Sequence, residues 1–297
     1  MMAIAKKKTK RHNFVAAFFL LPLALFYGMF YLYSFYFLIT TSFLRTDISL
    51  RNPVFVGLQN YVLLFTHDQF YRAIFNTLLF AGVAILAGLT IGFFLAVVLS
   101  IRMKGSHFFY AVFFLPSLMP MALVASVFGV MLEFRYGTLN IMMRAVGLDA
   151  LTQRWLVDPM WAYAAIFAIL VYVVGLPIMY YTADLSTLNV SLLEAAVVDG
   201  AGMMQMFRLV LFPLLRGAHK TITISVLLAS FRAFEIVYLS TGGGPSGRTE
   251  IVGTYLYDFA TSGSNVGYVS AASVIILLIA LGISFIQLTL YGRSEKA

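Results

Sequence analysis

Arg232 and Glu235 are ionisable residues in an otherwise apolar stretch that starts near Thr221 and resumes at Ile236. A charge inside a membrane span is costly and by default indicates a transport pathway. At a spacing of three residues, the two side chains are expected to share one helix face, where they can pair with each other. Two hypotheses stay open: a self-neutralising pair that fixes helix packing, or a polar surface that lines the route of a solute.

Aromatic residues flank these charges, since Phe234 lies between them and Tyr238 follows one turn later. Binding pockets combine flat apolar or aromatic surfaces with a few placed polar groups. Planar hydrogen-bonding groups beside aromatic faces suit a hydroxyl-rich solute such as a sugar. The residues Arg232, Phe234, Glu235 and Tyr238 are therefore the candidate substrate pathway.

A second candidate site lies in the segment 186–216, where apolar residues recur at helical spacing around Glu194 and Asp199. Asn189 and Ser191 are both suitable N-caps, and Glu194 follows Ser191 at the spacing of a capping box. The segment is too short to be a span and is expected to form an amphipathic cytoplasmic element.

Two glycines, Gly200 and Gly202, interrupt this segment. They predict a short helix, a glycine turn and a second helix that closes before Pro213. One interpretation is a helix lying on lipid headgroups. Small Ala-Ala and Gly-Ala-Gly surfaces, together with the acidic Glu194 and Asp199, favour docking to a partner protein instead.

Catalytic and metal-binding chemistry is not expected. The chain has no Cys, and its four His residues lack metal-ligand spacing. Beyond the N-terminal tail, Lys104, Lys220 and Lys296 are not preceded by Gly, so the chain has no phosphate-binding loop of the Gly-Lys-Ser/Thr type. We expect a non-enzyme that binds no cofactor itself.

Composition defines the elements that must position these residues. Apolar residues make up 61% of the 297 residues and charged residues only 11%, which excludes a soluble globular fold and a disordered chain. Six apolar runs are long enough to span a bilayer. We predict an all-α polytopic membrane protein whose six helices fall within 14–44, 73–101, 105–132, 159–183, about 221 onward, and 259–292.

The distribution of Lys and Arg predicts the orientation. A basic tail over residues 1–13 precedes the first run, and further basic residues follow the second, fourth and sixth runs. Both termini are therefore expected in the cytoplasm, with a second short tail at 293–297 and the transmembrane domain between them at 14–292. The net charge of +8 is an orientation signal and does not indicate nucleic-acid binding. Pro116, Pro120 and Pro177 predict kinks in the third and fourth helices.

The segment also resembles a known motif. Glu194-Ala195-Ala196, then Gly200 and later Phe212-Pro213, is similar to the EAA loop of binding-protein-dependent ABC importer permeases. The longer form with Asp199-Gly200-Ala201 and Phe207 resembles the carbohydrate-uptake branch. Further motifs occur in the family's order: Gly57-Leu58-Gln59-Asn60-Tyr61, Asn76-Thr77, Gly137…Asn140…Gly147, Trp155…Asp158-Pro159, Thr241-Gly242-Gly243-Gly244-Pro245…Thr249 and Gly267-Tyr268.

This resemblance implies a type I ABC importer fold and a set of partners. These are a second homologous permease subunit, a cytoplasmic ABC ATPase dimer that holds ATP and Mg, an extracytoplasmic solute-binding protein, membrane lipid and a carbohydrate. The chain would lie in the bacterial cytoplasmic (inner) membrane and move a sugar, oligosaccharide or related polyol by alternating access. The implied ATPase-coupling residues are Glu194, Ala195, Ala196, Asp199, Gly200, Ala201, Phe207 and Pro213, and Gly243, Gly244 and Pro245 would face the binding protein.

Two other functions remain as alternatives. A secondary transporter driven by an ion gradient would be expected to show inverted repeats and several midplane carboxylates, whereas Glu235 is the single carboxylate that we place within a span. A membrane-embedded enzyme would need clustered Asp, or His with Glu, near the interface. Transport without an ATPase partner would favour the first alternative.

Overall fold

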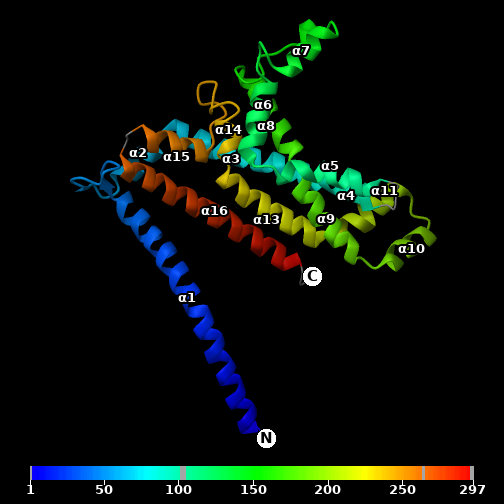
Figure 1. Cartoon of the computed structure of the whole chain (residues 1–297), viewed down its shortest axis with the longest axis horizontal. Coiled ribbons are helices and arrows are strands. Elements are labelled where there is room, and N and C mark those ends of the chain that lie inside the picture. Colours follow the sequence, from blue (N-terminus) through cyan, green and yellow to red (C-terminus); the bar gives the residue numbers. More distant parts are fainter. Residues whose placement is uncertain (1, 101–104, 263–264, 295–297) are drawn as a thin grey trace. The chain divides into compact units, whose positions relative to one another are not determined.

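The computed structural model is almost entirely helical and describes residues 2–100, 105–262 and 265–294 (Figure 1). The chain divides into two compact units. The first comprises residues 1–66 and 259–275, and the second comprises residues 67–258 and 276–297. The two units are described separately below.

The first unit contains a long helix and a small structure that we call the clasp, made of two short strands, a short helix and the start of the last helix. Its elements are α1 (Met2–Ser42), the paired strands β1 (Leu44–Arg45) and β2 (Val54–Phe55), α2 (Gln59–Phe65) and the start of α16 (Val266–Ser294). Most described α1 side chains, including Phe19 and Met29, are exposed. An apolar helix with an exposed surface of this kind suits a lipid environment.

Asn60 organises the clasp. Its side-chain nitrogen donates to the carbonyls of Ser42 at 2.8 Å and Leu44 at 2.9 Å, and its oxygen accepts from Asn265 at 2.8 Å. Gly267 lies so close to this loop that a Cβ atom there would lie 1.7 Å from the Leu44 carbonyl oxygen. The motifs around Asn60 and Gly267 are therefore structural, because they hold the start of α16 against the loop that follows α1.

The second unit contains the remaining helices, apart from the last three residues of α15, together with the later part of α16. Its main helices follow the predicted apolar runs: α3 (Asp68–Ala87), η1 (Gly88–Gly92) and α4 (Phe93–Ser100); α5 (Ser106–Leu118) and α6 (Met121–Met131); α8 (Pro159–Tyr172) and α9 (Gly175–Thr187); and α13 (Arg216–Arg232). The connecting elements are α7 (Thr138–Ala145), η2 (Asp149–Leu151), α10 (Val190–Val198), α11 (Met203–Gln205), η3 (Met206–Leu211), α12 (Phe212–Leu214), α14 (Glu235–Tyr238) and α15 (Val252–Thr261).

Within the residues that the structure describes, four helical segments are long and apolar enough to cross a membrane, or five if the bent pair α5–α6 counts as one span. The four are Phe18–Ser42, Asp68–Ser100, Pro159–Thr187 and Val266–Thr289. The prediction of an all-α membrane protein is confirmed, whereas the number six is not. The fifth predicted run forms α13, which ends at Arg232 after 17 residues.

The prolines of the third run produce the expected distortion. α5 ends at Leu118, Pro120 takes an extended conformation, and α6 starts at Met121 with its axis bent by 96° from that of α5. A proline cannot donate the helical hydrogen bond, so two of them four residues apart favour a break here. In the fourth run the helix is interrupted at Val173–Val174, just before Pro177.

Close backbone packing joins the helices around Pro177. A Cβ atom on Gly92 would lie 2.9 Å from the Pro177 Cβ, and one on Gly88 would lie 3.1 Å from its Cγ. A Cβ on Gly175 would meet the Ser117 hydroxyl at 2.6 Å. Glycine is required at such approaches, and small residues are the usual means of packing helices within a membrane.

Candidate functional site

The predicted coupling segment forms two helical pieces joined at a glycine turn. The Asn189 side chain accepts from the Ser191 backbone N–H at 3.1 Å, so Asn189 is the N-cap of α10 and Ser191 lies inside the helix. Gly200 has φ +80°, a conformation that favours glycine. The predicted helix, turn and helix are therefore confirmed.

The second piece runs further than predicted. α11, η3 and α12 form one continuous stretch from Met203 to Leu214, so the prediction that the helix closes before Pro213 is wrong. In the π-helical turn of η3, backbone N–H groups bond carbonyls five residues earlier instead of four. This change in the hydrogen-bond pattern comes just before Pro213, which has no N–H to donate.

The surface of this segment is exposed and largely apolar. Glu194, Ala195 and Asp199 are exposed, whereas Ala196 and Ala201 are partly buried. Val197, Val198, Met203 and Met204 are exposed apolar side chains around them, and Val198 is 86% accessible. Phe207 and Pro213 are half-buried, and the Phe207 ring contacts Phe93 of α4. Figure 1 shows α10 and α11 at the same end of the second unit as α4.

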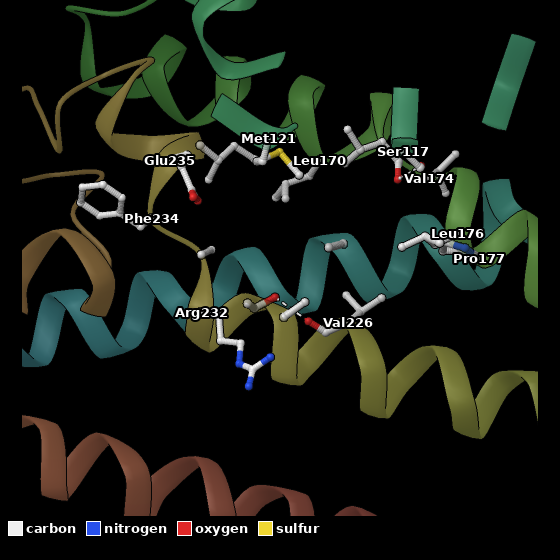
Figure 2. Close-up of a pocket in the computed structure, with 16 residues that line it drawn as sticks. Ser117, Met121, Leu170, Val174, Leu176, Pro177, Val226, Arg232, Phe234 and Glu235 are labelled. Carbon is white, nitrogen blue, oxygen red and sulfur yellow. Dashed lines mark hydrogen bonds between the residues drawn. The ribbon is translucent and has the colours of Figure 1, made fainter. Parts of the chain in front are cut away.

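The predicted pathway residues lie where one helix ends and the next begins. α13 ends at Arg232, Ala233 is extended with ψ 129°, and α14 begins at Glu235. The prediction that Arg232 and Glu235 share a helix face is therefore wrong. In Figure 2 the Arg232 guanidinium points away from Glu235, whose carboxylate points toward the other lining residues.

A glycine of another helix packs closely against this break. A Cβ atom at Gly253 in α15 would lie 2.3 Å from the Ala233 carbonyl oxygen. The backbone of α15 therefore packs directly on the extended residue between α13 and α14. The local sequence around Arg232 does not signal a helix end, and the backbone that packs there belongs to a residue twenty positions after Ala233.

A cavity of about 290 Å³ lies where three interrupted helices meet (Figure 2). Ser117 and Met121 come from either side of the α5–α6 bend, Val173 and Val174 from the α8–α9 break, and Ala233 from the α13–α14 break. Discontinuous helices that meet at one point are a feature of transporter binding sites. The full lining is Ala84, Ser117, Met121, Leu170, Val173, Val174, Leu176, Pro177, Val226, Ala229, Ser230, Arg232, Ala233, Phe234, Glu235 and Ile236.

Most of this lining is apolar. The Ser117 hydroxyl donates to the Val173 carbonyl at 2.9 Å and the Ser230 hydroxyl to the Val226 carbonyl at 2.8 Å. The Ser117 hydroxyl thus bonds a carbonyl at the α8–α9 break, whereas the Ser230 hydroxyl bonds back within its own helix. Among the lining residues, Arg232 and Glu235 are the ionisable ones and both are exposed.

The aromatic residues beside the break form a three-ring cluster. Phe234 stacks on Tyr238 with ring centres 4.7 Å apart and lies 4.9 Å from Tyr257, and the two tyrosine rings are 5.0 Å apart. Tyr257 comes from α15 and was not among the predicted pathway residues. Both tyrosines are about two-fifths accessible, so part of each side chain is open to a ligand.

The glycine-rich loop 241–249 is compact and internally bonded. The Thr249 hydroxyl donates to the Gly244 carbonyl at 2.6 Å and lies 2.8 Å from the Thr241 hydroxyl. Gly242 and Gly243 have φ +61° and +79°, which explains glycine at both positions. Gly244 and Pro245 are partly exposed, whereas Gly243 is buried, so the sequence-based expectation that all three face a partner does not hold for Gly243.

Helices α3 and α8 hold this loop. Asn76 donates to the carbonyls of Arg248 at 2.8 Å and Glu250 at 2.7 Å, and the Tyr163 hydroxyl donates to Arg248 at 2.6 Å. Glu250 itself is 2% accessible, and burial raises its pKa to about 7. The Gln69 amide bonds to this carboxyl group and opposes part of that increase.

The geometry defines a class: a helical membrane protein with a cavity at broken helices and an exposed helical segment at one end. The chain belongs to the family of binding-protein-dependent transport system inner membrane components, whose family model matches residues 88–294. This confirms the family expected from the sequence, that of ABC importer permeases.

Relatives and solved structures agree with this family. The chain is 35% identical over 245 residues to the probable ABC transporter permease protein YurN of Bacillus subtilis, covering 82% of this chain and 84% of the relative. It is 32% identical to the multiple sugar-binding transport system permease protein MsmF of Streptococcus mutans, covering 81% and 82%. A chain of the bacterial ABC transporter that imports the acidic polysaccharide alginate has the same fold, with TM-score 0.82 at 23% identity over 97% and 99% of the two chains.

Proposed function

We propose that the chain is one of two homologous permease subunits of an ATP-driven importer that moves a sugar, oligosaccharide or related polyol into the cytoplasm. The observation that carries this proposal is the cavity at three helix breaks, with charged groups and an aromatic cluster at its rim. Two curated relatives are named for sugar transport, the permease from Streptococcus mutans and the trehalose/maltose permease MalF of Thermococcus litoralis.

Membership of the family decides between the functions considered for the sequence. Importers of this family take their solute from a binding protein and their energy from an ATPase, so the ion-gradient alternative is not retained. The protein is an integral membrane permease with several apolar helices. From the six apolar runs we propose six membrane spans in a bacterial inner membrane. From the distribution of Lys and Arg we propose that both termini lie in the cytoplasm.

In this proposal α10 docks on a separate ATPase subunit that binds ATP and Mg. Exposed apolar residues such as Val198 and Met203 form the contact, and the Glu194 carboxylate gives it a charge to pair with. The opposite end of the unit receives the binding protein, with Gly244 and Pro245 on the accessible side of the glycine-rich loop.

The solute route passes the cluster of Phe234, Tyr238 and Tyr257 and the carboxylate of Glu235. Aromatic faces cover the apolar faces of a sugar ring, while tyrosine hydroxyls and Glu235 bond its hydroxyl groups. Alternating access then consists of movements of the half-helices on either side of the cavity, since broken helices can rearrange at their breaks.

Reversing the charge of Glu194 tests the docking. We expect Glu194→Lys to abolish co-purification with the ATPase and ATP-dependent uptake in proteoliposomes. The substitution replaces the carboxylate by a positive charge, which repels the positive group on the ATPase that would pair with Glu194. Asp149→Lys, an exposed acidic residue on η2, is the matched charge reversal and should leave both unchanged. Intact association and uptake in Glu194→Lys would refute the docking.

A further inference from the structure

A buried histidine joins the segment 203–214 to two helices of the bundle. His219 lies in the first turn of α13, ahead of the apolar stretch that begins near Thr221, and is 8% accessible. Its Nδ1 atom lies 2.7 Å from the Tyr181 hydroxyl of α9, and its Nε2 atom lies 2.9 Å from the Phe212 carbonyl oxygen of α12. One imidazole ring thus bonds to three elements, counting its own helix.

The partners determine the state of this ring. The Phe212 carbonyl can only accept, so Nε2 carries the hydrogen and Nδ1 accepts from the Tyr181 hydroxyl. Burial lowers the pKa of His219 below its ordinary value, with opposing contributions from the Phe212 carbonyl and from Asp184. The ring is therefore neutral and makes both bonds in a single tautomer.

Aromatic packing surrounds the same point. The Phe212 ring lies 4.2 Å from the imidazole ring, measured between centroids. Phe93 of α4 makes edge-to-face contacts with Tyr181 at 5.6 Å, with Phe212 at 5.5 Å and with Phe207 of η3 at 6.3 Å. These rings connect the exposed segment to α4, α9 and α13 by packed side chains, which shift together rather than deform separately.

Both bonded helices lead directly to the cavity. Tyr181 lies one turn after Pro177, and His219 lies two turns before Val226; Pro177 and Val226 both line the cavity. A displacement at Phe212 therefore reaches the two half-helices whose ends form the cavity wall.

We propose that His219 is a positioning residue that couples the ATPase-docking segment to the translocation cavity, through its bonds to Phe212 and Tyr181. This inference rests on the proposed function, because it takes the segment 186–216 as the place where the ATPase docks. It assigns to His219 a role that its sequence context does not reveal.

Three variants test it in the complete reconstituted complex of permease pair, ATPase and binding protein. His219→Phe keeps an aromatic ring and removes both bonds, Tyr181→Phe removes one, and the double variant removes the whole contact. Tyr61→Phe is the control, because it also deletes a bonded hydroxyl, 2.7 Å from Ser42, but in the first unit. The readouts are the amount of assembled complex, ATP hydrolysis and solute uptake.

We expect each of these three variants to assemble normally and to lower the number of solute molecules taken up per ATP hydrolysed by about tenfold. The double variant should lose no more than His219→Phe, since both act through one contact. His219→Gln, which keeps an N–H for the Phe212 carbonyl, should restore part of the ratio. Tyr61→Phe should keep the wild-type ratio.

An unchanged ratio in His219→Phe and Tyr181→Phe would overturn the inference. So would a fall in uptake that matches a fall in assembled complex, because that would be a purely structural effect. A failure of the proposed function is distinguishable: the wild-type complex would then show no ATP-dependent uptake, or Glu194→Lys would leave ATPase association intact.

Discussion

The side-chain amide of Asn76 donates to the backbone carbonyl of Glu250 at 2.7 Å, joining two residues 174 positions apart. The same amide nitrogen donates to the Arg248 carbonyl at 2.8 Å. One buried side chain of α3 thereby holds the end of the glycine-rich loop and the start of α15. The position of α15 matters for the site, because its Gly253 packs on the break beside Arg232 and its Tyr257 completes the aromatic cluster.

Asn76→Ala is therefore expected to destabilise the protein. It leaves the carbonyls of Arg248 and Glu250 without this donor, at a cost of about 2 kcal/mol in the free energy of unfolding. The measurement is the midpoint of thermal unfolding of the purified permease in detergent. A midpoint equal to that of the wild type would show that the loop does not depend on this bond.

Glu250 predicts a pH dependence of stability. Its pKa of about 7 in the folded protein lies above the ordinary value of 4.5, so the folded state favours the protonated form. The contribution of this group is fully present below about pH 4.5 and is lost as the pH rises through about 7. The unfolding midpoint of the wild type should fall across this range more than that of Glu250→Gln, which cannot ionise. Parallel pH curves for the two proteins would contradict the assignment.

Two glycines of α16 provide a matched pair. A Cβ atom at Gly267 would collide with the Leu44 carbonyl, whereas nothing lies within 4 Å of one at Gly282. Gly267→Ala should lower the free energy of unfolding by more than about 2 kcal/mol through strain. Gly282→Ala should leave it unchanged or raise it by up to about 1 kcal/mol, as expected for alanine in a helix interior. Equal effects at the two positions would rule out the tight clasp in the first unit.

The aromatic cluster makes a prediction about transport. Tyr257→Leu removes a ring and a hydroxyl at an exposed position, so we expect uptake at subsaturating solute to fall by about tenfold with assembly unchanged. Tyr257→Phe keeps the ring and should retain part of the activity. Wild-type uptake kinetics in Tyr257→Leu would remove Tyr257 from the proposed route.

The apolar runs were sufficient to predict which segments are helical, because the composition of a span is a local property. The Asn189 cap, the turn at Gly200 and the bend between Pro116 and Pro120 were also accessible, since each depends on residues adjacent in sequence. The break after Arg232 was not. Gly253 comes close to the backbone at this break, and a glycine in sequence does not indicate which backbone it will meet.

The site residues also divide into those that the local sequence predicts and those that it does not. Phe234 and Tyr238 were identified because they adjoin the charges, whereas Tyr257 and His219 owe their roles to contacts across helices. In the sequence, Asn140 was recognisable only as part of a family motif. In the structure its amide bonds to Phe134, Gln153 and Trp155 and so folds the segment after α6.

The central claim is that this chain conducts a saccharide only as part of an ATP-driven complex. The most direct measurement is uptake of a radiolabelled saccharide, chosen by its binding to the purified solute-binding protein, into proteoliposomes that contain the complete complex. The account predicts uptake that requires both the binding protein and ATP hydrolysis, and that is lost in Glu194→Lys. Uptake driven by an ion gradient in the absence of the ATPase would contradict it.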